Sequence, residues 1–339
     1  MSAFDLTDRE SRVLCAVVRH YVANGLPVGS HTVVEHDGLD LSAATVRNVM
    51  GALEERGYIT HPHTSAGRIP TDAGYRYYVD HLMRPLDLSG SERQRIDSGI
   101  RERDPADMRR LLQAVARALS KITGQAGVVL APNLHSGLFR DVHVCQVGER
   151  RYVLHLALDG GIARSAIVHT DFDVSADVLA RVCEVLNRRL RGEPLSELDS
   201  ALEHPATPDG EYALFLGAIG RMIAEGDDDQ VFVDGIAVLL RQPEFDTDDR
   251  AGAIAAILDD CAALRSVLRL HAPAAGEVRV TIGVEHTQPR LQQVSVARAR
   301  YRVAGLDGVL GVLGSTRMPY DLVTAAVTHA AGTLDIMQW

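Results

Sequence analysis

The stretch from Leu41 to Arg68 constrains the fold most, because it combines one amphipathic helix with a short hairpin. Ser42 carries a hydroxyl that can accept a backbone N–H at the start of a helix. Behind it, apolar residues recur with the spacing of one buried helical face, at Val46, Val49, Met50 and Leu53. Gly57 ends the helix, since glycine adopts a left-handed φ without a Cβ clash.

A small hairpin follows this helix directly. Tyr58-Ile59-Thr60 and Arg68-Ile69 have strand character, and Ser65-Ala66-Gly67 supplies a turn with a glycine for positive φ. Upstream, the pattern predicts a long helix, a short helix and a glycine-containing turn. This order, closed by a helix with a polar outer face and a hairpin, is typical of a winged helix-turn-helix. We therefore expect a DNA-binding domain.

Local capping signals place the flanking helices. Thr7-Asp8-Arg9-Glu10 is a capping box that precedes an apolar-periodic run, and Ser30 caps the short helix. Pro70-Thr71 starts a further helix after the hairpin. We expect this domain to end near Arg84-Pro85.

The charge balance limits the partners of the chain. Its formal net charge is −10, and residues 1–84 hold 8 Arg and no Lys against 10 Asp and Glu. Specific contacts, rather than a strongly basic surface, must then carry DNA binding. Four scattered cysteines without a CxxC pair, no signal-peptide pattern and no apolar run of about 18 residues indicate a cytoplasmic protein without a membrane span.

The remaining three-quarters of the chain has an α+β pattern. Residues 86–104 are polar and are expected to be a linker, partly helical. Helices are expected at 106–123, 174–191, 194–202, 211–225, 251–270 and 319–334. Strands are expected at 125–130, 139–147, 151–158, 162–168, 278–284, 294–303 and 308–313. Two strand groups separated by helices indicate one sheet domain interrupted by an inserted piece.

Several blocks of the sequence closely resemble the family of heat-inducible transcription repressors called HrcA. In the first domain the resemblance rests on Pro27-Val-Gly-Ser30, Thr45-Val-Arg-Asn48, Gly57-Tyr58, Pro62-His-Thr-Ser-Ala-Gly-Arg-Ile-Pro-Thr71 and Gly74-Tyr-Arg-Tyr-Tyr-Val-Asp80. It continues through Leu186-Asn187, Leu190, Gly192, Gly235, Pro243-Glu244-Phe245, Gly314-Ser-Thr-Arg-Met318 and Tyr320. The hairpin block is long and specific.

The resemblance implies a homodimeric repressor that binds double-stranded DNA at an inverted-repeat operator upstream of chaperone genes and is regulated by the chaperonin GroEL. It also implies a multidomain α+β fold: an N-terminal winged helix-turn-helix, then a GAF-like α/β domain that carries an inserted α+β dimerisation domain. On this basis we expect a winged-helix domain at 1–85, the linker at 86–104, a GAF-like domain at 105–135 and 230–339, and the dimerisation domain at 136–229.

Eight residues are expected to bind DNA. A recognition helix inserts its first residues into the major groove, while phosphate contacts fix its register. The candidates on the helix are Ser42, Thr45, Arg47 and Asn48, and those on the hairpin are His63, Thr64, Ser65 and Arg68. Glu54 and Glu55 lie further along the helix and are expected to point away from the duplex.

Other interpretations remain open beside the repressor. The GAF-like domain could bind a small effector that controls DNA binding, an analogy at the level of the fold alone. An enzyme is not expected, because His143 and Cys145 lack an orienting acid, and the His61–His63 pair lacks a third metal ligand. No cofactor or metal is expected. Arg298, Arg300 and Arg302 alternate along one strand and are interpreted as an exposed face, with an anion pocket or partner surface as alternatives.

Overall fold

The structure is a computed structural model that describes most of the chain. The described residues are 6–37, 40–62, 67–84, 86–101, 108–132, 137–159, 162–195, 214–215, 217–219, 221, 230–245, 252, 254–257, 260–269 and 273–337. The chain forms two compact units. The first comprises Met1–Val129, Val233–Ala299 and Leu310–Ala330, and the second comprises Leu130–Phe232, Arg300–Val309 and Ala331–Trp339.

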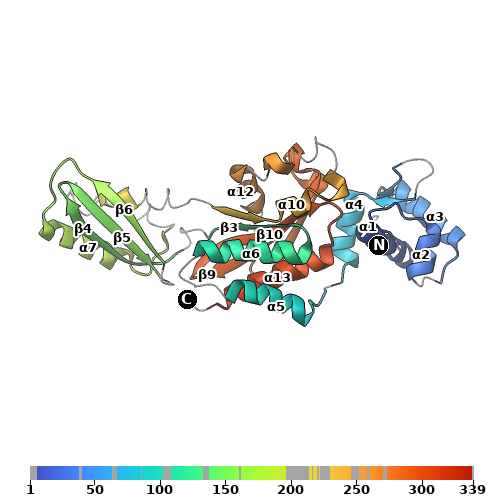
Figure 1. Ribbon diagram of the computed structural model, residues 1–339, viewed down its shortest axis with the longest axis horizontal. Helices are drawn as coiled ribbons and strands as arrows, with labels where there is room; N and C mark the ends of the chain where they lie inside the picture. Colours follow the sequence, from blue (N-terminus) through green and yellow to red (C-terminus); the bar gives the residue numbers. More distant parts are fainter. Residues whose placement is uncertain are drawn as a thin grey trace. The chain divides into compact units, whose positions relative to one another are not determined.

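The N-terminal part of the first unit is a helical cluster with a two-stranded hairpin (Figure 1). Its elements are α1 (Asp8–Asn24), α2 (Ser30–Asp37), α3 (Ala43–Glu55), β1 (Ile59–Thr60), β2 (Ile69–Pro70) and α4 (Asp72–Tyr77), which continues as a π-helical turn over Tyr78–Leu82. The predicted capping box is confirmed, since Thr7 and Glu10 bond each other's backbone N–H. The apolar faces of α1 and α3 are buried, at Val13, Leu14, Val17, Val46, Met50 and Leu53.

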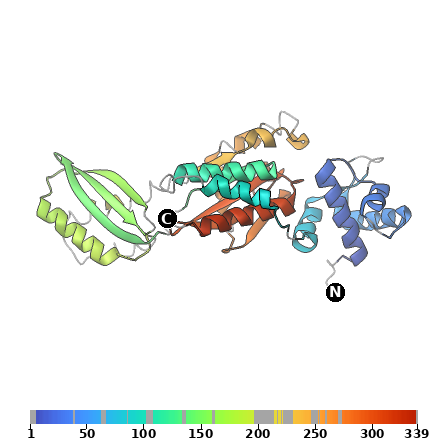
Figure 2. The ribbon, with the colours of Figure 1, turned by 60° about the horizontal axis from the view of Figure 1, so that its bottom comes forward.

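A five-stranded sheet is built mostly from residues of the first unit. Its hydrogen-bonded order is β7-β3-β10-β9-β8, with β3 at Ala126–Leu130, β7 at Val231–Asp234, β8 at Val278–Ile282, β9 at Val294–Val303 and β10 at Leu306–Ser315. Helices α6 (Met108–Thr123) and α13 (Tyr320–Asp335) run side by side over one face, as Figures 1 and 2 show. Every residue of β3 is buried, which explains its continuous apolar sequence.

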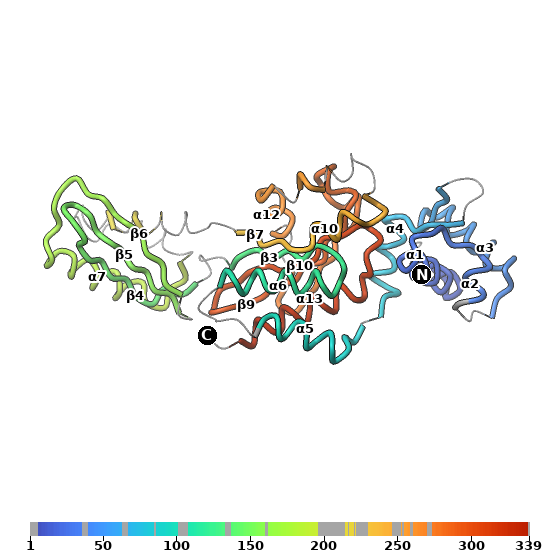
Figure 3. The backbone as a smooth tube through the Cα atoms, in the orientation of Figure 1, coloured from blue at the N-terminus to red at the C-terminus, as the bar shows by residue number. Residues whose placement is uncertain are grey.

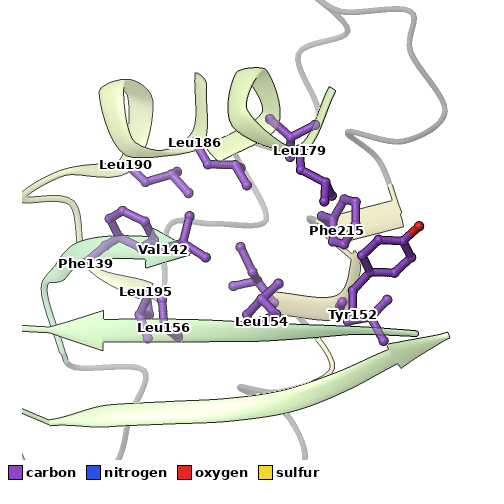
Figure 4. Packing of buried hydrophobic residues seen from close by; sticks show 14 of the residues in the cluster. Phe139, Val142, Tyr152, Leu154, Leu156, Leu179, Leu186, Leu190, Leu195 and Phe215 are labelled. Atoms are coloured by element: carbon purple, nitrogen blue, oxygen red, sulfur yellow. The ribbon is translucent and has the colours of Figure 1, made fainter. Parts of the chain in front are cut away.

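Three strands and one helix build the core of the second unit. The strands β4 (Phe139–Gly148), β5 (Arg151–Leu158) and β6 (Ala163–His169) form the antiparallel meander that the sequence predicts. Helix α7 (Ala176–Leu190) packs on one face of this sheet (Figure 4). Alternate strand residues meet the helix in a buried cluster that includes Tyr152, Leu154, Leu156, Leu179, Leu186 and Phe215. One covered face is therefore enough to explain the alternating pattern of β5.

Some predicted elements differ from the structure. The segment expected to be a partly helical linker contains helix α5 (Gly90–Arg101), and the departure is that Ile96 and Ile100 of this helix are fully buried. The helix expected at 251–270 is not continuous, because Asp260 is non-helical and its carboxylate accepts the N–H groups of Ala262 and Ala263 at the start of α12 (Cys261–Arg269). Figure 3 traces the backbone through α5 and α12. The helices expected at 194–202 and 211–225 lie largely outside the described residues.

The arginine row on β9 was interpreted as an exposed face, and for Arg298 that interpretation is wrong. Exposure rises along the strand, because Arg298 is buried, Arg300 is half-buried and Arg302 is exposed. The Arg298 guanidinium donates to the carbonyl oxygen of Val267 in α12 at 3.0 Å. Burial, reinforced by the nearby charge of Arg279, lowers the pKa of Arg298 to about 10. Helix α12 therefore covers the end of this strand face on which Arg298 lies. The alternation of residues along β9 does not show whether another element covers the face.

Two motifs that lie far apart in the sequence meet beside the five-stranded sheet. Arg317 follows β10, and Glu244 lies in the short 3-10 turn Pro243–Phe245. The guanidinium and the carboxylate form a two-pronged ion pair in which Nε and Nη2 of the arginine face the two oxygens. Both side chains are largely buried, so the pair is shielded from water.

Candidate nucleic-acid interface

Helix α3 presents a polar face that its own packing leaves open. Its N-cap is Ser42, whose hydroxyl accepts the backbone N–H of Thr45 at 3.1 Å. The same hydroxyl lies 2.9 Å from the Thr45 hydroxyl. Because Val46, Met50 and Leu53 fix the buried side, the opposite side faces outward with Arg47 and Asn48 exposed. The first turn therefore offers hydroxyl, amide and guanidinium groups on one surface.

The end of α3 leads directly into the hairpin. Gly57 has φ +78°, and the N–H groups of Gly57 and Tyr58 bond the carbonyls of Glu54 and Leu53. The hairpin strands pair Ile59 with Pro70 and Thr60 with Ile69. The prediction that Gly57 ends α3 with a left-handed φ is confirmed, and the hairpin leaves the helix directly after it.

The base of the hairpin is held from both sides. Arg68 pairs with Val28 through two backbone hydrogen bonds of 2.8 and 2.9 Å. A Cβ at Gly67 would lie 2.6 Å from the carbonyl group of Val28, so this position has no room for a side chain. Thr71, which follows β2, donates from its hydroxyl to the carbonyl of Gly57, which precedes β1, at 2.6 Å. This bond joins the two ends of the hairpin. The hairpin therefore leaves a rigid base.

The structure places five of the eight sequence-predicted residues. Ser42, Thr45, Arg47 and Asn48 come together on the first turns of α3, while His63, Thr64 and Ser65 lie outside the described residues. Arg68 is described, and its Nη2 lies 2.8 Å from Oε2 of Glu54. Sequence reasoning missed that Glu54 also contacts His61, so that one carboxylate faces both stems of the hairpin. An acidic residue on the last turn before a basic hairpin is the signal that could have found it.

Two arginines of the helical cluster are held by carboxylates. The pKa of Glu10 is lowered by the backbone hydrogen bond from Thr7, and Arg56 also lies 3.3 Å from its carboxylate. Arg56 and Arg68 are thus engaged by carboxylates, whereas Arg47 is exposed on the open face of α3. Arg47 is the one arginine of α3, and its exposed position leaves it open to a phosphate or a base.

Other candidate chemistries find little support in the described residues. Within them there is no group of three or more His, Cys, Asp or Glu side chains suited to a metal ion. The expectation that His143 lacks an acidic partner is wrong, because Oδ2 of Asp141 lies 2.9 Å from Nε2 of His143. Cys145 lies on the exposed side of β4 with its thiol near the carbonyl of Val153. Among the helices that the structure describes, none is long and apolar enough to cross a membrane.

Comparison with known proteins identifies the family. The family model described as the HrcA protein C-terminal domain matches residues 109–323. The chain belongs to the HrcA family. A heat-inducible transcription repressor HrcA from Chlorobium chlorochromatii is 34% identical over 97% of both chains. The protein of the same name from Geobacter sulfurreducens is 34% identical over 96% of both chains.

One solved structure supports the fold of the HrcA-family chain along its whole length. It is described as a hypothetical protein at 2.2 Å resolution, and it covers 98% of each chain with a TM-score of 0.60. The two sequences are 24% identical, so the likeness concerns the mixed α/β, multidomain fold and not the activity.

Proposed function

We propose that this chain is a homodimeric transcriptional repressor of heat-shock (chaperone) operons. Its DNA-binding domain is a winged helix-turn-helix within residues 1–85, in which α3 reads the major groove and the hairpin is the wing. The single observation that carries the proposal is the exposed polar face of the first turns of α3, where Arg47 and Asn48 follow the Ser42 cap, in a chain of the HrcA family. Its curated relatives are named heat-inducible transcription repressors.

Each candidate residue has a proposed role. Arg47 and Asn48 contact base edges, since a guanidinium matches guanine and an amide matches adenine. Ser42 and Thr45 contact the phosphate backbone at the start of the helix, where N–H groups favour anions. His63, Thr64 and Ser65 on the wing reach the backbone or the adjacent minor groove, and Arg68 meets a phosphate at the wing base.

The dimer is part of the same proposal. An inverted-repeat operator presents two half-sites related by a two-fold axis, which a homodimer matches with two recognition helices. We assign dimerisation to an inserted domain at 136–229 and propose a GAF-like domain at 105–135 and 230–339. A linker at 86–104 joins the winged-helix domain to the GAF-like domain. Light scattering at micromolar concentration tests the dimer, and a monomer would contradict it.

Regulation by the chaperonin GroEL completes the proposal. It rests on the family resemblance, in which the chaperonin promotes DNA binding and unfolded proteins titrate the chaperonin away. The repressor then acts in the cytoplasm without a cofactor and without enzyme activity. A footprint of the purified protein upstream of the chaperone operons, with and without chaperonin, tests this point. An unchanged footprint at limiting repressor concentration would contradict it.

The decisive experiment measures operator affinity by fluorescence anisotropy. The double variant Arg47→Ala/Asn48→Ala should bind the inverted repeat about 100-fold more weakly, because each lost base contact costs roughly 1–3 kcal/mol. Arg290→Ala is the matched control, since Arg290 is exposed in the sheet domain, and its affinity should equal that of the wild type. Equal affinities for the double variant and the wild type would refute the proposal.

A second candidate is a repressor controlled by a small effector. One observation favours it: a half-open cavity of about 350 Å³ lies between the segment after α4 and helix α13. Its lining is mainly apolar and includes Met83, Leu86, Leu88, Arg93, Thr324 and His329. Asp87 also lines the cavity and lies 3.4 Å from Arg93, and His329 lies 2.9 Å from Asp97. Such a lining suits a small, mainly apolar molecule. Operator affinity that responds to a metabolite, but not to chaperonin, would favour this candidate.

A further inference from the structure

Both stems of the hairpin converge on one carboxylate of α3. His61 precedes the hairpin tip and Arg68 follows it, and each contacts a different oxygen of Glu54. Nδ1 of His61 faces Oε1, while Nη2 of Arg68 lies 2.8 Å from Oε2. Glu54 is in the last turn of α3, so these contacts tie the wing to the recognition helix itself.

The backbone of Arg68 is fixed independently of this ion pair. Its N–H and carbonyl both bond Val28, and the tight approach at Gly67 prevents a shift of the strand towards that residue. What Glu54 controls is therefore the direction of the guanidinium and not the position of the strand. The Nε of Arg68 is buried and makes no hydrogen bond within the described part of the chain, so its terminal N–H groups carry the contacts.

The pair is partly exposed, as a group that reaches a ligand must be. The side chains of Arg68 and Glu54 are 28% and 24% exposed. One terminal nitrogen faces the carboxylate, and a guanidinium has further N–H donors in its plane. A guanidinium can therefore bridge Glu54 on one side and a phosphate on the other.

The carboxylate stays ionised at neutral pH. Burial by itself raises the pKa of Glu54, but the hydrogen bond with His61 and the charge of Arg68 outweigh it, so the pKa lies below its usual range. An ionised partner strengthens the hold on the guanidinium, since hydrogen bonds between charged groups are shorter and stronger than neutral ones.

We propose that Glu54 is a positioning residue for DNA recognition: it orients the guanidinium of Arg68 so that its free N–H groups meet a phosphate beside the half-site read by α3. The inference rests on the proposed function and deepens it. The proposed function gives Arg68 a phosphate contact at the wing base, and the inference adds the residue that orients the Arg68 guanidinium for it. A negative charge near DNA ordinarily weakens binding, and here Glu54 strengthens it because it directs a cation.

The test compares two charge-matched variants of the full chain. Glu54→Gln and Glu55→Gln each remove one negative charge from neighbouring positions of α3, and Glu55 is exposed. The Glu55→Gln variant should bind the operator as well as the wild type or slightly better, because repulsion from DNA falls. The Glu54→Gln variant should bind about tenfold more weakly. Equal affinities for the two variants would overturn the inference.

A double-mutant cycle shows whether the effect passes through Arg68. In an Arg68→Ala background, Glu54→Gln should have no further effect on operator affinity. In Glu54→Gln, the slope of log Kd against log salt concentration should also fall in magnitude by about one for each winged-helix domain, as expected for one lost phosphate contact. A general loosening of the head would weaken binding equally in both backgrounds and would overturn the inference. Absence of operator binding by the wild type would instead overturn the proposed function itself, and this inference with it.

Discussion

The side-chain amide of Asn187 bonds both backbone groups of Val142. Its Oδ1 accepts the N–H at 2.7 Å, and its Nδ2 donates to the carbonyl at 3.1 Å. Val142 lies on β4, an edge strand of the three-stranded sheet, and Asn187 lies on α7. The amide thus occupies backbone groups that an open edge would offer to another strand.

Replacing Asn187 by Ala should expose that edge. The N–H of Val142 should exchange with solvent at least tenfold faster, and the second unit should lose about 1–3 kcal/mol of unfolding free energy, because two buried backbone groups lose their partners. Hydrogen exchange of residues 139–148 measures the first effect. Arg188→Ala, at the exposed neighbouring position, is the control. Equal protection of β4 in both variants would show that the amide does not close the edge.

The histidine after the 3-10 turn Gly283–Glu285 should make stability depend on pH. Burial, helped by the charge of Arg298, lowers the pKa of His286 from 6.5 to about 4. The folded chain therefore binds fewer protons than the unfolded chain between these values. The stabilisation is complete above pH 6.5 and is lost as the pH falls towards 4, by about 3 kcal/mol.

A variant isolates this contribution. His286→Leu should flatten the loss of unfolding free energy between pH 6.5 and 4.5, measured by urea denaturation followed by circular dichroism. His169→Gln, at an exposed position, should keep the wild-type slope. If the His286→Leu slope matched the wild type, other groups would have to account for the acid sensitivity.

The close contact of α6 with β3 depends on Gly127. A Cβ at this position would lie 2.0 Å from the carbonyl oxygen of Ala116, which is backbone and cannot swing aside. Gly127→Ala should therefore lower the midpoint of thermal unfolding, at a cost of about 3 kcal/mol. Gly99→Ala in α5 is the matched control, since its Cβ would make an ordinary 3.5 Å contact with Ala118 and should stabilise the helix. A thermal midpoint for Gly127→Ala as high as that of Gly99→Ala would contradict this packing.

Local patterns predicted those elements whose causes lie within a few residues. The capping box at Thr7 and the Ser42 cap were readable because the donor and acceptor are three residues apart. Strand β9 spans Val294–Val303, the range expected from the sequence, and it ends at the turn Ala304-Gly305, where both residues have positive φ.

What the sequence could not predict depends on distant partners. Alternation placed Arg298 on the same face as Arg302, but only the fold shows that α12 covers the first of them. Glu54 was expected to point away from DNA because it lies further along α3, and that position does not show which side chains are its neighbours. Its contacts depend on how the hairpin returns past α3, which the tight approach of Gly67 to Val28 determines.

Ser42 has one hydroxyl and two proposed roles, as helix cap and as DNA contact, and two substitutions separate them. Ser42→Ala removes the acceptor for the Thr45 N–H, so α3 should lose about 1 kcal/mol of stability and operator affinity should fall with it. Ser42→Asp restores a capping acceptor and a charge that the helix N-terminus favours, so stability should return. A carboxylate beside a phosphate is repelled, however, and operator affinity should fall by at least another tenfold. Thermal unfolding and operator anisotropy, measured on the same two variants, distinguish the roles. Recovery of both stability and affinity in Ser42→Asp would mean that Ser42 acts as a cap alone and that the phosphate lies elsewhere on α3.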